Sequence, residues 1–231
     1  DGRGRHDKRL YPAMPYPSYT LTTDDDIAAL YAYFQTIPAV SHDVQTNQLS
    51  FPFSLRADMA VWNLMEFDKG PYQPDASQTE EWNRGAYLVN GLGHCNTCHT
   101  TKNLLFGDKS GREYEGGLID GWFAPNITGS KQYGLGDWSV DEVVSYLKTG
   151  ANDRALASAG MAEVIVNSTS QMTDPDIRAM AVYLKSLEPS KDEPVTAVAA
   201  DDPAMVAGAA IYKDNCAACH QDSGEGNPSL F

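Results

Sequence analysis

The sequence lacks the features of several large protein classes. In its 231 residues no apolar run approaches the length of about 20 residues that spans a bilayer. Basic residues are scarce, with 17 Lys and Arg against 31 Asp and Glu, and the formal net charge of −14 argues against nucleic acid as a partner. Glycine-rich nicotinamide and P-loop fingerprints are also absent. What remains is an acidic chain with 42% hydrophobic residues, enough for one or two buried cores.

Cysteine is scarce too, and all four cysteines lie in two C-x-x-C-H segments. Two thiols three positions apart lie on one side of a helical turn, where they can form thioethers to the two vinyl groups of one porphyrin. The histidine that follows can then ligate the iron. The pattern predicts two attachment sites for haem c, formed by Cys95, Cys98 and His99 and by Cys216, Cys219 and His220.

A single C-x-x-C could instead be a redox disulfide or half of a zinc site. A structural zinc site would pair the two groups, yet the whole segment 99–215 separates them. A thioredoxin-like site would come with a βαβ pattern, which the sequence does not show. Two motifs that use every cysteine therefore favour haem over both alternatives.

Two helical patterns recur 150 residues apart, at 23–34 and 173–184. Each begins with a Thr cap and acids in the first turn, and Pro175 suits the second start. Apolar residues follow at helical spacing: Ile27, Leu30, Tyr31 and Phe34, and Ile177, Met180, Ala181 and Leu184. Both segments are predicted to be helices.

A helix is also predicted before each haem motif, over 80–89 with a capping box of Ser77 and Glu80, and over 204–213. Each contains a glycine, Gly85 or Gly208. Glycine inside a helix costs about 1 kcal/mol relative to Ala, so it often marks close helix contact, although simple tolerance is the alternative.

A further helix begins at the capping box of Ser139 and Glu142 and ends at Gly150. Strand signals are scarce. The sequence thus predicts an all-α fold with long loops, built from tandem class I cytochrome c-like domains. The expected parts are the C-terminal part of a first domain (1–40), a linker (41–74), a complete second domain (75–190) and the N-terminal part of a third (200–231). The two flanking domains are expected to be truncated.

The predicted linker is rich in apolar residues such as Trp62 and Phe67. One interpretation is a short helix that covers a domain core, and the other is a contact surface for a partner subunit. The first is favoured, because an apolar linker between packed domains needs burial in any case.

Methionine is the sixth ligand that suits an electron-transfer haem. Met161 is predicted to ligate the His99 haem, and Met14, at a similar place in the repeat, the haem of the first domain. Met172 is the rival in the second domain, and core filling is the commoner role of Met. The sixth ligand of the His220 haem is expected beyond Phe231.

The other histidines are weaker candidates. His94 precedes Cys95 and is expected to point away from the iron, while His6 and His42 lie in polar segments and are expected to be exposed.

The loop after the first motif supplies candidates for the haem pocket. Trp122, Pro125 and Asn126 lie where cytochromes commonly place wall residues. A backbone carbonyl near Pro125 could accept from the His99 ring N–H and hold the imidazole. Trp138 is expected to be a core anchor.

At these residues the chain resembles the three-haem cytochrome c subunit of bacterial membrane-bound gluconate, sugar and alcohol dehydrogenases. The resemblance covers nearly the whole chain and rests on the segments 11–16, 81–95, 124–128, 136–139, 146–150 and 161–164. It implies three haems in the parent protein and a separate catalytic subunit that carries flavin or pyrroloquinoline quinone. Electrons would pass to membrane ubiquinone at the periplasmic face of the inner membrane, and a C-terminal region absent here would contact the membrane.

Two other functions stay open. A dihaem peroxidase or a thiosulfate-oxidising cytochrome would need an open or unusual axial position, and a small shuttle cytochrome would need only one haem. A Met-ligated, six-coordinate haem leaves no site for substrate. The sequence therefore favours an electron-transfer subunit that is not itself the catalyst.

Overall fold

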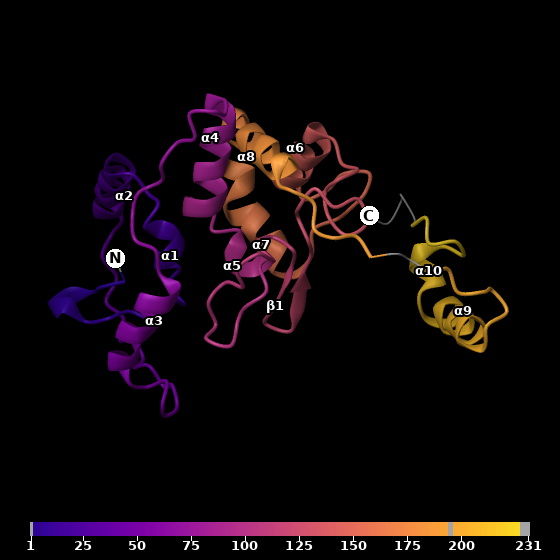
Figure 1. Ribbon diagram of the computed structural model, residues 1–231, viewed down its shortest axis with the longest axis horizontal. Helices are drawn as coiled ribbons and strands as arrows, with labels where there is room; N and C mark the ends of the chain where they lie inside the picture. The colour runs from indigo at the N-terminus through magenta and orange to yellow at the C-terminus, as the bar shows by residue number, and fades with distance from the viewer. Residues whose placement is uncertain (1, 194–195, 227–231) are drawn as a thin grey trace. The chain divides into compact units, whose positions relative to one another are not determined.

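The computed structural model describes residues 2–193 and 196–226 (Figure 1). They form two compact units, one within 1–192 and one within 193–231, and each is described by itself. Helices make up most of the regular structure, so the predicted helical class is confirmed. The sequence did not predict the short antiparallel hairpin of β1 (Gly117–Ile119) and β2 (Trp122–Ala124). Across the described residues, no helix is long and apolar enough to cross a membrane.

The elements follow one another in chain order. The first part of the larger unit carries η1 (Arg5–Asp7), α1 (Tyr16–Tyr19), α2 (Asp24–Thr36), η2 (Arg56–Asp58) and α3 (Met59–Glu66). Its second part carries α4 (Glu80–Tyr87), η3 (Leu88–Leu92), α5 (Asn96–His99), α6 (Val140–Thr149), α7 (Ala159–Asn167), η4 (Thr169–Gln171) and α8 (Asp174–Ser186). The smaller unit carries α9 (Pro203–Asn215) and α10 (Ala217–His220).

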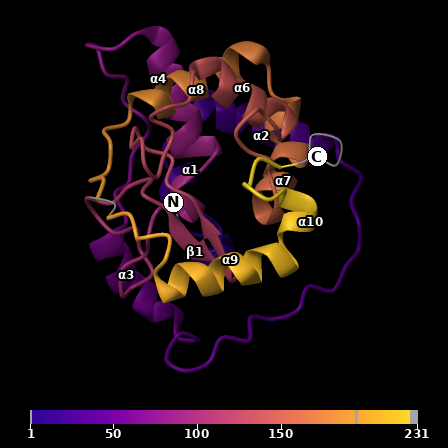
Figure 2. The same ribbon diagram turned by 90° about the vertical axis from the view of Figure 1, so that its right-hand side faces the viewer.

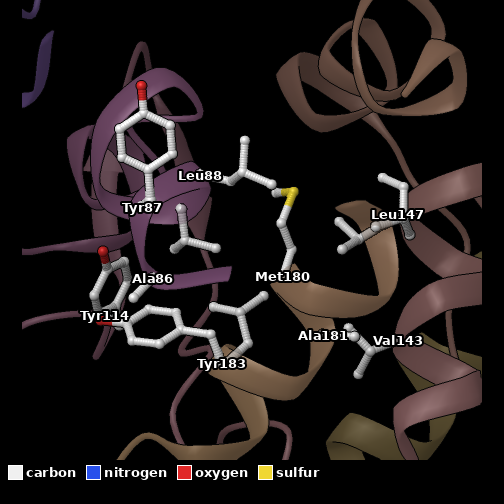
Figure 3. Packing of buried hydrophobic residues seen from close by; sticks show 12 residues of the cluster. Ala86, Tyr87, Leu88, Tyr114, Val143, Leu147, Met180, Ala181 and Tyr183 are labelled. Carbon is white, nitrogen blue, oxygen red and sulfur yellow. The ribbon is translucent and has the colours of Figure 1, made fainter. Parts of the chain in front are cut away.

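The core of the larger unit lies where α8 packs between α4 and α6 (Figure 3). In this view Met180 of α8 points toward Leu88 of η3. Val89 and Ile177 are fully buried, and each such aliphatic side chain contributes about 1.5–3 kcal/mol to folding. Trp138, the predicted core anchor, packs partly buried against this cluster.

Gly85 lets α4 and α8 approach closely. A Cβ placed on Gly85 would lie 1.9 Å from the Ala179 carbonyl oxygen and 2.8 Å from Cβ of Tyr183. Only glycine is compatible with that distance, so the predicted helix contact is confirmed here. At Gly208 of α9 no described atom lies within 4 Å of such a Cβ. The two glycines of the repeat therefore differ in what surrounds them.

Local hydrogen bonds explain where the helices begin. The Thr23 and Thr173 side chains accept from the backbone N–H groups of Asp26 and Asp176, so both predicted Thr caps are confirmed. The capping box at the start of α6 is also present, and Gly150 ends that helix with φ of 83°.

The predicted cap of α4 was wrong. Thr79, not Ser77, caps the helix, because its hydroxyl accepts from the N–H of Trp82 at 3.1 Å. The Ser77 hydroxyl instead donates to Asp75 at 2.7 Å. Thr79 directly precedes the first helical residue, which puts its oxygen within reach of the third N–H of the helix.

Between α2 and α3, residues 38–50 run as an extended connection without regular structure (Figure 2). The short helix predicted in the linker is present as α3. Tyr16 of α1 is 3% exposed, donates to Asn63 Oδ1 at 2.6 Å and packs edge-on against Trp62 and Phe67. Trp62 Nε1 donates to the Leu105 carbonyl at 2.8 Å. Helix α3 thus covers Tyr16 and also contacts the loop after the first haem motif.

The first part of the larger unit is bonded to its second part. The Tyr87 hydroxyl of α4 donates to Asp26 at 2.5 Å and accepts from the Thr23 N–H at 3.2 Å, at the start of α2. The Tyr19 ring packs edge-on against His94, with centroids 5.6 Å apart. These contacts join residues on either side of position 75, where the sequence predicted the start of the second domain. The domain limits stay predictions.

An ion pair between Arg84 of α4 and Asp176 of α8 gives a pH-dependent prediction. Two hydrogen bonds join them, at 2.7 and 3.1 Å, and they lower the pKa of the Asp176 carboxyl although burial opposes the shift. The ionised pair therefore stabilises the fold above the unfolded pKa of about 3.9, and the gain is lost as the pH falls through the lower folded pKa.

Asp176→Asn should lower the free energy of unfolding at pH 7 by about 0.5 kcal/mol, since both side chains are partly exposed. The difference from the parent should shrink toward zero as the pH falls below about 3.9. Urea titrations at pH 7 and pH 3 measure both values. Asp25→Asn, in the first turn of α2, is the matched control, and an equal pH-dependent loss in that variant would rule out the ion pair as the cause.

Candidate haem-attachment site

The first C-x-x-C-H segment occupies one helical turn. Cys95 caps α5, and the N–H groups of Cys98 and His99 donate to its carbonyl at 3.3 and 2.9 Å. Both cysteines are free. Because the turn brings residues three and four apart onto one side, the two sulfurs and the imidazole can serve a single planar group.

The chain enters this turn through an unusual backbone. After α4 the helix widens into the π-helical η3, and π turns are frequent at functional sites. His94 follows with φ of 37°, and the Cys95 N–H donates back to the Val89 carbonyl at 3.1 Å. This bend holds the first cysteine against η3.

His99 is oriented by a backbone carbonyl. Its Nδ1 lies 2.7 Å from the Pro125 oxygen, the predicted contact. A carbonyl oxygen can only accept a hydrogen bond, so Nδ1 carries the proton. Nε2 is then unprotonated, and its lone pair is available to a metal. Burial lowers the pKa of His99, although the Pro125 bond opposes this, and the imidazole is therefore neutral at pH 7. A neutral, oriented imidazole is what an iron ligand requires.

The two thiols are not activated. Burial raises the pKa of Cys95 to about 12. Burial also raises the pKa of Cys98, although the Lys102 charge opposes it. A redox dithiol would need at least one lowered pKa. The electrostatics at this motif thus disfavour the disulfide alternative.

A buried polar network supports the turn and was not foreseen from the sequence. Tyr114 donates to Asn90 Oδ1 at 2.5 Å, and Asn90 Nδ2 donates to the Tyr183 hydroxyl at 3.0 Å. Asn90 belongs to η3 and Tyr183 to α8. Tyr114 has φ of 64°, and burial raises its pKa. No pattern in the sequence marks this set, because its members come from three separate segments.

The second motif forms a similar turn in the smaller unit. Cys216 caps α10, and the N–H groups of Cys219 and His220 donate to its carbonyl at 3.2 and 3.0 Å. The Tyr212 hydroxyl of α9 donates to the Gln221 carbonyl at 2.7 Å and ties the helix to the residue after the motif.

The other predicted site residues lie in several places. Trp122 is 62% exposed on β2, next to the strand that contacts α5. Met161, on α7, and Met172 both pack partly buried against the core, so burial does not separate them. Met14 is 58% exposed.

Asn126 is buried, and its side chain is bonded to Thr128 and Ser190. His6 and His42 are exposed, as expected.

The donor set fits haem c. Each motif offers two free thiols and a histidine on one turn, and at the first motif the histidine is neutral and oriented. Thioether attachment together with one nitrogen ligand is the chemistry that this set can provide.

Comparisons with known proteins agree with this chemistry. The sequence model of the cytochrome c family matches residues 205–230, around the second motif. The chain is 39% identical to the fructose dehydrogenase cytochrome subunit of Gluconobacter japonicus, over 95% of this chain and 50% of that protein. It is 38% identical to the gluconate 2-dehydrogenase cytochrome c subunit of Pantoea cypripedii, over 96% of this chain and 55% of that protein.

A third relative, a subunit of the nicotinate dehydrogenase of Pseudomonas putida, is much longer. The chain is 40% identical to it over its whole length, which is 20% of that protein. The chain thus spans about half, or less, of the length of these three curated relatives.

Proposed function

This chain is a homologue of the cytochrome c subunits of fructose, gluconate and alcohol dehydrogenases, and from that relationship we propose that it carries electrons through covalently bound haem c. The observation that carries the proposal is the His99 imidazole, held by the Pro125 carbonyl at 2.7 Å on the same turn as two free thiols. When bound, haem c supplies one-electron oxidation and reduction at its iron.

The protein's own residues have separate tasks in this proposal. Cys95 and Cys98 would attach the haem of the larger unit, and His99 and Met161 would ligate its iron. Pro125 holds the imidazole through Nδ1 and would leave Nε2 free for the iron, and Trp122 and Asn126 would belong to the surrounding wall. The smaller unit would attach a second haem through Cys216 and Cys219, with His220 as a ligand of its iron, and Met14 would be a ligand of a further haem.

The proposed electron donor is a flavin- or quinone-dependent dehydrogenase subunit, since several relatives are named as cytochrome subunits of dehydrogenases. The proposed acceptor is ubiquinone, at the periplasmic face of the bacterial inner membrane. The net charge of −14 would favour a basic docking surface on the donor.

Ligation by Met161 is the first test. The Met161→Ala variant should be made in a protein whose Cys216 and Cys219 are already replaced by alanine, so that only the His99 haem contributes to the spectrum. Met161→Ala should abolish the near-infrared methionine-to-iron band and allow carbon monoxide to bind the reduced iron, because the sixth position becomes open.

Met172→Ala is the matched control, since this Met is also partly buried against the core. It should keep the band and exclude carbon monoxide. An unchanged band in Met161→Ala would refute the assignment. If the protein that retains Met161 binds carbon monoxide, the result would favour the alternative function, a redox enzyme whose iron has an open sixth position.

A further inference from the structure

We propose that Asn126 and Ser190 are positioning residues for the His99 haem, and that they link its axial ligand to the segment 187–192 that follows α8. This inference rests on the proposed function, because it concerns the iron that His99 would ligate. It means that residues outside the attachment motif and the iron ligands influence the reduction potential of that iron.

The argument begins with the peptide bond between Pro125 and Asn126. The carbonyl oxygen that accepts from His99 Nδ1 lies in the same rigid plane as the N and Cα atoms of Asn126. Whatever fixes Asn126 therefore fixes the direction of that carbonyl. The sequence alone gives Asn126 no such task.

Asn126 is 8% exposed, and its amide is bonded on both sides. Its Oδ1 accepts from the N–H and the hydroxyl of Thr128, each at 2.8 Å. Its Nδ2 donates to the Ser190 hydroxyl at 2.7 Å. The backbone N–H of Ser190 in turn donates to Thr128 Oγ1 at 3.2 Å, which closes a ring of three residues.

Two further contacts tie the same loop to the segment 187–192. The Gly129 N–H donates to the Leu187 carbonyl at 3.1 Å, and a Cβ on Gly129 would lie 2.6 Å from that oxygen. The Ser130 side chain, fully buried, donates to the Asp192 carboxylate. Buried polar groups in a closed network hold one geometry, since breaking a bond leaves a partner unpaired.

This arrangement acts on the iron through the strength of one hydrogen bond. A well-placed acceptor at Nδ1 makes the imidazole a stronger donor to the metal, which favours the oxidised iron. Loosening the loop should weaken that bond and favour the reduced iron. The expected change is a higher reduction potential of the His99 haem, with attachment and methionine ligation unchanged.

The experiment compares Ser190→Ala with two reference variants, each made with Cys216 and Cys219 replaced by alanine. Ser190→Ala should raise the ratio of reduced to oxidised haem about threefold at a fixed potential, or about 28 mV at 59 mV per tenfold change. Ser190→Thr keeps the hydroxyl and should restore the parent potential. Ser186→Ala is the matched control, because its hydroxyl contacts Trp82 and Tyr183 instead of Asn126.

A second measurement separates positioning from a general loss of stability. Proton NMR of the reduced protein should show faster solvent exchange of the His99 Nδ1–H in Ser190→Ala and in Asn126→Ala, but not in Ser186→Ala. The inference fails if the potential and the exchange rate of Ser190→Ala equal those of the parent. It also fails if Ser186→Ala shifts both equally. Absence of covalent haem in the parent would instead refute the proposed function.

Discussion

A chain in which Cys95 and Cys98 are both alanine should carry one covalent haem in place of two. Each C-x-x-C pair forms two thioethers to one porphyrin, so removal of one pair removes one complete site and leaves the other. The remaining haem should be attached to Cys216 and Cys219, whose turn lies in the other compact unit. The intact mass after denaturation and the pyridine haemochrome absorbance per chain measure the stoichiometry directly.

The reciprocal variant makes this count decisive. Replacing Cys216 and Cys219 with alanine should also leave one haem, now on the larger unit, and replacing all four cysteines should leave none. If the parent chain carries a single haem, or if either double variant keeps two, the assignment of two attachment sites is wrong. Because the two turns belong to separate units, the two losses should be additive.

Gly85→Ala should lower the free energy of unfolding of the larger unit by about 3 kcal/mol, at the upper end of the usual cost of overpacking. The added methyl group would lie 1.9 Å from the Ala179 carbonyl oxygen, so α4 and α8 would have to separate. A glycine-to-alanine change inside an unhindered helix has the opposite sign and stabilises by about 0.5–1 kcal/mol.

Gly208→Ala is the matched control, because it is the same change in the corresponding helix with no described atom within 4 Å. It should be neutral or slightly stabilising for the smaller unit. Guanidinium titrations followed by near-ultraviolet circular dichroism measure both variants. A Gly85→Ala variant as stable as the parent would show that the close approach of the two helices is not required.

The sequence by itself determined the features that depend on a few neighbouring residues. The haem motifs, the Thr caps of α2 and α8 and the capping box of α6 each lie within one helical turn, where spacing alone sets the geometry. Even at this range a choice between adjacent candidates can fail. The prediction chose Ser77 as the cap of α4, whereas Thr79 is the cap, because the exact start of a helix is weakly marked in sequence.

The tertiary structure alone decided which distant groups meet. The bond from Tyr114 to Asn90 joins residues 24 apart, and the bond from Asn126 to Ser190 joins residues 64 apart. The contact of Gly85 with Ala179 likewise depends on how α8 returns along α4. Periodicity shows which face of a helix is buried but not what it is buried against, since that depends on the paths of the loops between elements. The same limit explains why two glycines in repeated helices looked alike in the sequence and only one proved to lie in a tight contact.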